Sequence, residues 1–274
     1  MPGELYVVGT PIGNLGDFSP RAVETLRTVD FIAAEDTRVS IKLLNYFDIK
    51  NKLIAYHEHN RAEKGPSIVE RILAGESCAL VTDAGMPAIS DPGQDLVRLC
   101  HESGIKVNTV PGPSAIITAL ALSGLEVSRF TFEGFLTGNK PKRREHLEEI
   151  KTERKTMVFY EAPHKLAATL HDLHTALGDR KIALIKELTK IHESVEHTTL
   201  SEAAAKYNGV KLKGEYVLII EGKKKEESTE DEIDGITLAK QLVAEGLSAS
   251  EAAKRAAKES GMKKGDIYKA LMEE

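Results

Sequence analysis

The chain has 274 residues, and its 37 Lys and Arg against 42 Asp and Glu give a formal net charge of −5 at pH 7. This balance excludes a surface that binds polyanions everywhere, so any contact with nucleic acid must come from local basic patches. There is no apolar run of 18 residues and no basic start before a long apolar stretch, so we expect a cytoplasmic protein. Cys78 and Cys100 are expected to be buried thiols in a reducing compartment.

The first half of the chain alternates short apolar runs with amphipathic stretches. The runs predict strands at residues 5–9, 30–35, 52–56, 78–82 and 106–110. Residues 19–29, SPRAVETLRTV, predict a helix with Ser19 as its N-cap and Pro20 at its first position. Such alternation is typical of βαβ units around a mainly parallel sheet.

The second half repeats this kind of pattern. Apolar runs predict strands at residues 130–135, 156–161, 181–187 and 215–222, and helices are expected near 141–152 and 164–177. The fold class is therefore α/β, and we expect two α/β domains, over residues 1–112 and 113–222.

The C-terminal part has a different composition. Residues 223–235, KKKEESTEDEIDG, are charged and predict a linker. Residues 236–274 predict a module of three short helices that resembles a helix-turn-helix, in which Gly246 and Gly261 end helices. Ser248 and Glu251 have the spacing of a capping box before the second helix.

Four predicted strand ends carry unusual loops, and ligands of parallel α/β sheets bind beyond such ends. The loops are GTPIGNLGD (9–17), AAEDTR (33–38), VTDAGMPAISDPG (81–93) and VPGPSA (110–115). Proline restricts φ and glycine allows close backbone approach, so these loops are expected to be rigid and to present main-chain NH and C=O groups.

These loops can be compared with two known kinds of nucleotide-binding loop, the dinucleotide-binding fingerprint and the P-loop. The glycines Gly9, Gly13 and Gly16 do not have the G-x-G-x-x-G spacing of a dinucleotide site, and Pro11 stiffens the turn. A P-loop is excluded because no Lys-Ser/Thr follows the glycines. AAEDTR is open to two interpretations, a helix start capped by Asp36 or Thr37, or the polar floor of a substrate site.

The motif series, continued by FEGFL, FYEAPHK, KELTKIHE and GEYVLIIEG, resembles the ribosomal RNA small-subunit methyltransferase I family of the tetrapyrrole-methylase-like class. The resemblance covers nearly the whole chain and departs only where Thr137 replaces a usual proline. It implies S-adenosylmethionine (AdoMet)-dependent 2′-O-methylation of the ribose of a cytidine in the decoding region of 16S rRNA. The resemblance also implies that the substrate is the 30S subunit and that the enzyme is a homodimer.

The resemblance also implies that AdoMet lies in a cleft between the two α/β domains, with Asp83 facing the cationic ligand. Carried onto this sequence, it implies as cofactor-binding residues Pro11, Asp83, Ala84, Gly85, Pro87, Ile89, Ser114, Ala115, Ala162, Pro163, Gly214, Glu215 and Tyr216.

Methyl transfer to a ribose hydroxyl needs an aligned acceptor and help with its proton. The hypothesis that follows makes Glu35 or Asp36 the proton acceptor or substrate anchor, with Arg38 and Lys186 stabilising the developing alkoxide or binding phosphate. No metal is required, and His57 and His59 at i, i+2 are too few ligands to predict one.

Contacts with RNA are expected from two basic clusters. The candidates are Lys140, Lys142, Arg143 and Arg144 before the helix near 141–152, and Lys254, Arg255, Lys263 and Lys264 in the C-terminal module. Solvated helix surfaces would explain the same charges. Two other functions stay open, a small-molecule methyltransferase, which would not need these clusters, and a nucleic-acid-binding regulator without turnover.

Overall fold

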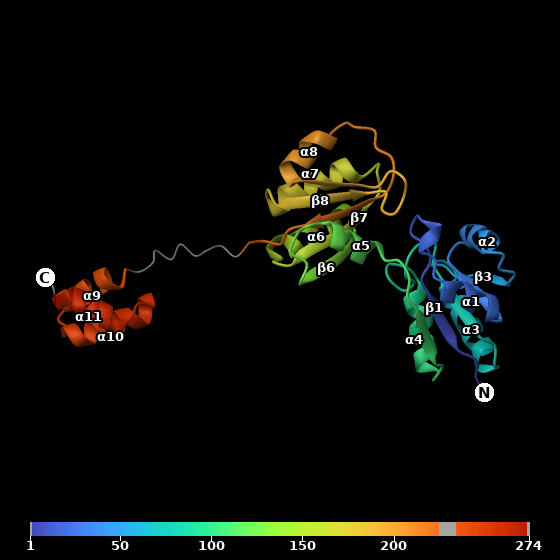
Figure 1. Cartoon of the computed structure of the whole chain (residues 1–274), viewed down its shortest axis with the longest axis horizontal. Helices are drawn as coiled ribbons and strands as arrows, with labels where there is room; N and C mark the ends of the chain where they lie inside the picture. The colour runs from blue at the N-terminus through green and yellow to red at the C-terminus, as the bar shows by residue number, and fades with distance from the viewer. Residues whose placement is uncertain (1, 225–233, 273–274) are drawn as a thin grey trace. The chain divides into compact units, whose positions relative to one another are not determined.

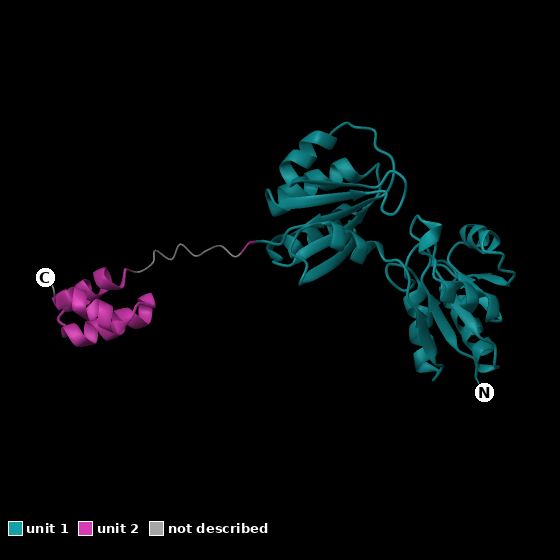
Figure 2. Cartoon of the chain, viewed as in Figure 1, with its two compact units in different colours: residues 1–223 teal, residues 224–274 magenta. Residues whose placement is uncertain are grey.

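The computed structural model describes residues 2–224 and 234–272, which fall into two compact units, residues 1–223 and 224–274 (Figures 1 and 2). Unit 1 contains two α/β halves, each built on a five-stranded sheet. The domain boundary at residues 112 and 113 stays a prediction, and residues 225–233 of the predicted linker lie outside the described residues. Within the described part, every helix is too short or too polar to cross a lipid bilayer.

The first sheet has the strand order β3-β2-β4-β1-β5, and all its neighbouring strands are parallel, as the alternating pattern predicts. Its strands are β1 (Leu5–Val8), β2 (Phe31–Ala34), β3 (Leu53–Ala55), β4 (Cys78–Val81) and β5 (Val107–Val110). The connections hold η1 (Leu15–Asp17), α1 (Pro20–Thr28), α2 (Thr37–Tyr46), α3 (Arg61–Leu73) and α4 (Gly93–Glu102). The Oγ of Ser19 accepts a hydrogen bond from the Ala22 amide at 3.1 Å, so the predicted N-cap of α1 is confirmed.

Strand β4 explains why the apolar runs are continuous. Cys78 and Leu80 pack into the hydrophobic cluster on one face of the sheet, and Ala79 and Val81 into the cluster on the other. A strand covered on both faces by helices has no polar side, unlike a strand with one wet face. Cys78 and Cys100 lie in the first of these clusters as free buried thiols, which confirms that expectation.

The second sheet has the order β6-β7-β10-β8-β9. Its strands are β6 (Phe130–Phe135), β7 (Thr156–Glu161), β8 (Lys181–Lys186), β9 (Ser194–Thr199) and β10 (Tyr216–Ile220), and its helices are α5 (Ala115–Leu122), α6 (Lys140–Glu149), η2 (Ile150–Thr152), α7 (Leu166–Leu177) and α8 (Leu200–Tyr207). Only β6 and β7 are parallel. Strand β9 was not expected, because its sequence SVEHTT is polar and lies at the sheet edge.

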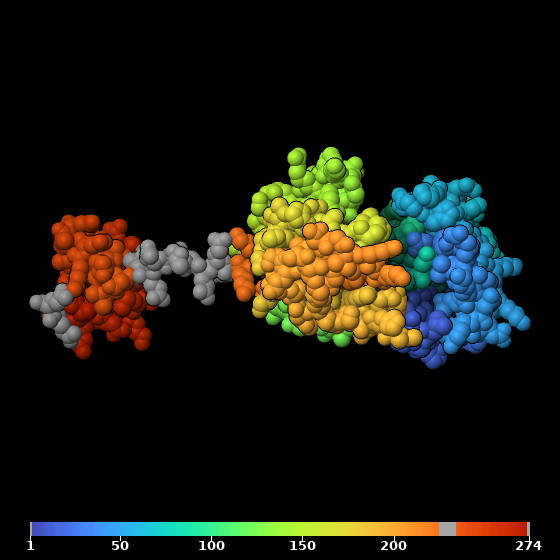
Figure 3. Space-filling model, turned by 90° about the horizontal axis from the view of Figure 1, so that it is seen from above, coloured from blue at the N-terminus to red at the C-terminus, as the bar shows by residue number. Residues whose placement is uncertain are grey.

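The second sheet is also covered on both faces. Val217 and Ile219 of β10 pack with residues of α5, whereas Tyr216 and Leu218 pack with residues of α7 and α8. Seen in space-filling form, the yellow and orange surface of this half adjoins the blue surface of the first half (Figure 3). One cleft is lined both by loops of the first sheet and by residues at the carboxyl ends of β7 and β8 and at the start of β10.

In its described part, unit 2 consists of α9 (Gly235–Ala244), α10 (Ala249–Ser260) and α11 (Lys264–Met272), which confirms the three predicted helices. Ser248 caps α10, and its hydroxyl contacts the Glu251 carboxylate at 2.7 Å. Gly261 follows α10 with φ 74°, a left-handed conformation that glycine adopts without strain. The core of the unit contains Ala239, Leu242, Ala252, Ala253, Ala256 and Ile267, and Leu238, Met262 and Leu271 pack against it.

The ends of β1 and β5 approach each other at two glycines. A Cβ on Gly9 would lie 2.7 Å from the backbone N and Cα of Gly112, and a Cβ on Gly112 would lie 2.9 Å from the backbone of Gly9. The Gly9 amide also donates to the Val110 carbonyl at 3.0 Å. Contact between two backbones leaves no flexible side chain that could move aside, so only glycine fits at either position.

Gly9→Ala is therefore expected to lower the free energy of unfolding by about 3 kcal/mol, since overpacking against backbone forces the two loops apart. Gly138→Ala is the matched control, because a Cβ there meets nothing within 4 Å. The control should change stability by less than about 1 kcal/mol. Urea denaturation followed by circular dichroism measures both, and equal stabilities of the two variants would contradict the close-contact explanation.

Candidate functional site

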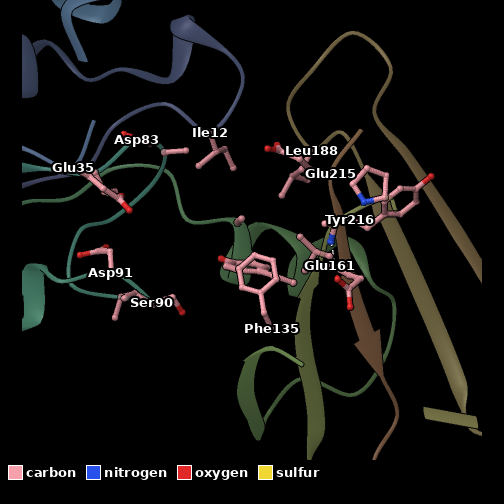
Figure 4. A pocket seen from close by; sticks show the side chains of 18 of the residues that line it. Ile12, Glu35, Asp83, Ser90, Asp91, Phe135, Glu161, Leu188, Glu215 and Tyr216 are labelled. Carbon is pink, nitrogen blue, oxygen red and sulfur yellow. Dashed lines mark hydrogen bonds between the residues drawn. The ribbon is translucent and has the colours of Figure 1, made fainter. Parts of the chain in front are cut away.

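A cleft of about 610 Å³ opens where loops of the first sheet face the ends of β7, β8 and β10 (Figure 4). Its lining from the first half consists of Ile12, Glu35, Thr82, Asp83, Ala84, Ile89, Ser90 and Asp91. The lining from the second half consists of Ala115, Phe135, Tyr160, Glu161, Ala162, Pro163, His164, Leu188, Glu215, Tyr216 and Val217.

The first wall is built by the ends of four neighbouring strands, in the order β2, β4, β1 and β5. The loops after β1 and β4 are joined by an isolated antiparallel bridge, in which the amides of Thr10 and Gly85 each donate to the other residue's carbonyl, at 2.9 and 3.1 Å. The Thr10 hydroxyl adds a 3.1 Å hydrogen bond to the Thr82 carbonyl. The four motif loops predicted to form a site therefore do lie side by side.

The loop of residues 82–93 is held in an unusual backbone conformation. Ala88 and Ser90 have φ values of 69° and 65°, a left-handed region that disfavours side chains with a Cβ. Asp91 stabilises this conformation, because its Oδ1 accepts from the amides of Ala88 at 2.9 Å and Gly93 at 2.7 Å. Burial raises the pKa of Asp91 above its usual range. Residues in such strained backbone conformations cluster at binding and active sites.

Two carboxylates occupy the floor of the first wall. The Thr82 hydroxyl donates to Glu35 Oε2 at 2.5 Å, and the Asp36 amide donates to Asp83 Oδ1 at 3.1 Å. Burial first, and then the nearby charge of Glu35, raise the pKa of Asp83. In Figure 4 the side chains of Glu35, Asp83 and Asp91 all lie on the same side of the cleft.

Asp36 and Arg38 lie beside the cleft without lining it. Asp36 is the N-cap of α2, and the Arg38 guanidinium binds both its carboxylate oxygens, with Nη2 2.6 Å from Oδ2. These hydrogen bonds lower the pKa of Asp36 to about 2. The capping interpretation of AAEDTR is thus confirmed for Asp36, while Glu35 of the same motif reaches the cleft. Lys186 ends β8 and does not line the cleft either.

The second wall combines aromatic rings with an ordered loop. Phe135 and Tyr160 line the cleft with their ring centroids 5.5 Å apart. Beyond β8, Glu187 Oε1 accepts from the Glu215 amide at 2.9 Å and from Lys190 Nζ at 3.0 Å. Gly214 has φ 89° where a Cβ would meet the Glu187 side chain at 2.7 Å, so the chain enters the cleft beside an ordered carboxylate.

The cleft brings together many of the residues predicted to bind a cofactor. Those that line it are Asp83, Ala84, Ile89, Ala115, Ala162, Pro163, Glu215 and Tyr216. Pro11, Gly85, Ser114 and Gly214 each directly precede or follow a lining residue, and Pro87 lies within the 82–93 loop. Sequence reasoning missed Phe135, Tyr160 and Glu161 as individual residues, although the motifs FEGFL and FYEAPHK contain them.

The charge of the cleft is one-sided. Among its described lining residues the charged ones are Glu35, Asp83, Asp91, Glu161 and Glu215, and neither Lys nor Arg occurs. Glu215 is partly neutralised by Lys190, whose Nζ lies 2.8 Å from its Oε2. An acidic cleft favours a cationic or amine-bearing ligand and repels phosphate. Across the described residues, no group of three or more His, Cys, Asp or Glu is arranged to hold a metal ion.

None of the predicted basic residues is among the described residues that line the cleft. Lys140, Lys142 and Arg144 are exposed in the first turns of α6, and Lys254, Arg255, Lys263 and Lys264 are exposed in unit 2. Arg143 differs from its neighbours, since its side chain is only 15% exposed and its Nε donates to Asp172 Oδ2 at 2.7 Å. The structure thus separates Arg143 from the solvent-facing charges of the same helix.

Comparison with known proteins gives a consistent result along the chain. Residues 4–204 match the family model described as tetrapyrrole (corrin/porphyrin) methylases. A ribosomal RNA small subunit methyltransferase I from Synechocystis sp. is 45% identical, over 99% of this chain and 98% of that protein. The protein of the same name from Escherichia coli O157:H7 is 44% identical, over 99% of this chain and 96% of that one.

Solved structures show the same fold at lower identity. Uroporphyrin-III C-methyltransferase from Thermus thermophilus, complexed with S-adenosyl homocysteine, is 17% identical with a TM-score of 0.55, and the match covers 80% of this chain and 97% of that one. A cobalt precorrin-4 methyltransferase of cobalamin biosynthesis is 16% identical with a TM-score of 0.60, over 80% and 94% of the two chains.

Proposed function

The chain belongs to the ribosomal RNA small subunit methyltransferase I family of the tetrapyrrole methylases, and from this premise we propose that it methylates 16S rRNA with AdoMet as donor. The finer proposal is that the acceptor is the ribose 2′-hydroxyl of a cytidine in the decoding region, presented by the 30S subunit in the cytoplasm. The observation that supports an RNA acceptor is the share of this chain that each kind of relative matches. The two rRNA methyltransferases reported above each match 99% of the chain, whereas the family model ends at residue 204 and the two small-molecule methyltransferases cover 80%.

The cleft has the chemistry that AdoMet requires. AdoMet supplies a methyl group on a positively charged sulfonium and also carries an amine, and the charged lining of the described cleft is acidic. We assign the cofactor to the 83–89 segment, Ala115, Ala162 and Pro163, and the Gly214–Tyr216 approach, with their flanking residues. Rigid loops with main-chain groups facing the cleft would hold the ligand with little loss of conformational entropy.

Glu35 is the better candidate for the proton acceptor. Transfer breaks the S–CH₃ bond, forms an O–CH₃ bond, passes the hydroxyl proton to a base and leaves S-adenosylhomocysteine. Glu35 lines the cleft and is oriented by Thr82, whereas the low pKa of Asp36 makes it a weak base. Alignment of the acceptor can supply about 7 to 11 kcal/mol of the barrier reduction.

RNA phosphates would be bound outside the acidic cleft. Arg38 is 88% exposed at the start of α2, and Lys186 ends β8 without lining the cleft. Both residues therefore suit contact with phosphate better than stabilisation of an alkoxide inside the cleft. Lys140, Lys142 and Arg144, together with Lys254, Arg255, Lys263 and Lys264 of unit 2, are the further proposed contacts. Contacts of this kind position RNA without reading its sequence.

We propose a homodimer that covers apolar surface near α5 and β6. Ile117 of α5 is 57% exposed, and Leu122, Val127 and Phe130 are also exposed, which is unusual for large apolar side chains grouped in one stretch of chain. Light scattering of the purified protein should give twice the chain mass. Ile117→Glu should shift the mass toward one chain, since it places a charge in the interface. A monomeric wild type would contradict the proposal.

Asp83→Asn is expected to weaken AdoMet binding about tenfold at pH 7, the effect of losing a charged contact. Because its carboxyl pKa is raised, the ionised form is present above that pKa and is lost as the pH falls through it, at a higher pH than for an exposed Asp. Affinity in the wild type should therefore fall on the acid side, and the variant should show a flatter acid limb. Calorimetric titration from pH 4 to pH 8 measures this, with exposed Asp17→Asn as control.

Transfer of labelled methyl from AdoMet to 30S subunits that lack their own modification, with naked 16S rRNA in parallel, tests the whole proposal. A 2′-O-methylcytidine in the decoding region, mapped by nuclease digestion and mass spectrometry, is the expected product. AdoMet binding without transfer to either RNA would favour a small-molecule acceptor. In single-turnover form, Glu35→Gln should be about a hundredfold slow as a lost general base, and wild-type rates for Glu35→Gln and Asp36→Asn would refute a base at either position.

A further inference from the structure

Arg143 is the basic residue of α6 whose surroundings differ most from those of a phosphate contact. It lies between the exposed Lys142 and Arg144, yet its guanidinium points into the protein and makes four hydrogen bonds. Nε donates to Asp172 Oδ2 at 2.7 Å, and Nη2 donates to Thr169 Oγ1 at 3.0 Å. Nη1 donates to the carbonyls of Leu136 and Thr137, each at 3.4 Å.

One branch of this network ends at the cleft through Thr169. The Thr169 hydroxyl, which accepts from Arg143, donates its own proton to Glu161 Oε2 at 2.5 Å. Thr169 and Glu161 are 1% and 3% exposed, so the hydrogen bond between them lies away from bulk water. The other oxygen of Glu161 accepts from the Ala162 amide at 2.9 Å, and Glu161, Ala162 and Pro163 line the cleft in succession.

A second branch fixes the neighbouring aromatic wall. The Leu136 and Thr137 carbonyls directly follow Phe135, which is 59% exposed and whose ring lines the cleft beside that of Tyr160. Phe135 has little packing of its own to hold it, so its position depends on the backbone that carries it. The same guanidinium therefore restrains the chain on both sides of the second wall.

Only arginine can make this set of contacts. Its planar fork offers five N–H groups in fixed directions, whereas a lysine ammonium is a single point and would reach Asp172 or the carbonyls but not both. A buried network with one missing partner leaves donors and acceptors unsatisfied, so its members act as a unit. Replacement of Arg143 or of Thr169 would therefore break the hydrogen-bonded connection between α6 and Glu161.

We propose that Arg143 is a positioning residue for the AdoMet site, which acts through Thr169 on Glu161 and through the Leu136 and Thr137 carbonyls on Phe135, and that it does not contact RNA phosphate. This inference rests on the proposed function in one respect, that the cleft binds AdoMet. It assigns to the interior of the protein a charge that sequence alone places with its solvent-facing neighbours.

Isothermal titration of AdoMet into the full-length chain tests the inference without any RNA. Arg143→Lys and Thr169→Val should each weaken AdoMet binding about tenfold, the effect of one unsatisfied buried partner. Thr169→Ser keeps the hydroxyl and should bind like the wild type. Thr175→Val is the matched control, because the exposed Thr175 hydroxyl on the same helix bonds only the His171 carbonyl. Thermal unfolding confirms that each variant is folded at the assay temperature.

The double variant Arg143→Lys, Thr169→Val adds a readout that general destabilisation would not give. Because both changes break one network, its loss of affinity should be clearly smaller than the product of the two single losses. Independent, multiplying losses would overturn the link through Thr169. Wild-type affinity in Arg143→Lys, or equal losses in Thr169→Ser and Thr169→Val, would overturn the proposal itself.

Sedimentation with 30S subunits distinguishes the competing role. Arg144→Gln should weaken 30S binding and leave AdoMet affinity unchanged, and Arg143→Lys should do the opposite. If Arg143 bound phosphate, Lys would substitute with little loss of either, and Arg143→Gln would resemble Arg144→Gln. If the wild type binds no AdoMet, the proposed function and this inference are both refuted. If the wild type binds AdoMet and Arg143→Lys binds it equally tightly, the inference alone is refuted.

Discussion

The backbones of Gly9 and Gly112 touch where β1 and β5 leave the first sheet, and the arrangement of the site follows from this contact. It brings the PGPSA turn against the loop after β1, which is itself bridged to the loop after β4 at Thr10 and Gly85. Three loops far apart in sequence thereby become one rigid surface. The strained residues Ala88 and Ser90 can persist there because the surrounding hydrogen bonds determine the backbone on both sides.

The cleft is lined by acidic side chains and the start of α6 carries exposed basic ones, so the two regions suit ligands of opposite charge. The acidic lining attracts a sulfonium and an amine, and the same charges oppose the entry of a phosphate backbone. An enzyme that joins a cationic donor to a polyanionic acceptor must keep these two binding regions apart. Lys140, Lys142 and Arg144 at the start of α6 meet that requirement, because they are exposed and none of them lines the cleft.

The sequence predicts the strands well wherever burial on both faces makes the run continuously apolar, as in CALV and YVLII. It fails for β9, whose polar edge sequence SVEHTT carries no such signal. The site loops are recognisable because Gly and Pro have local conformational meaning. Glu35 faces the cleft and Asp36 does not, and Arg143 faces inward while its neighbours face solvent. These differences depend on the direction in which each side chain points after folding, which adjacent residues of like chemistry do not reveal in a sequence.

The buried residues of unit 2 include Ala239, Leu242, Ala252, Ala253, Ala256 and Ile267, with Leu238, Met262 and Leu271 packed against them, so alanine is the most frequent buried side chain. Each buried alanine removes less apolar surface from water than a leucine would, so it contributes less hydrophobic free energy and a smaller heat-capacity change. A module this small also buries a smaller share of the surface of its chain than a larger domain does. A ligand that binds only the folded form of unit 2 would therefore add its binding free energy to a small hydrophobic contribution.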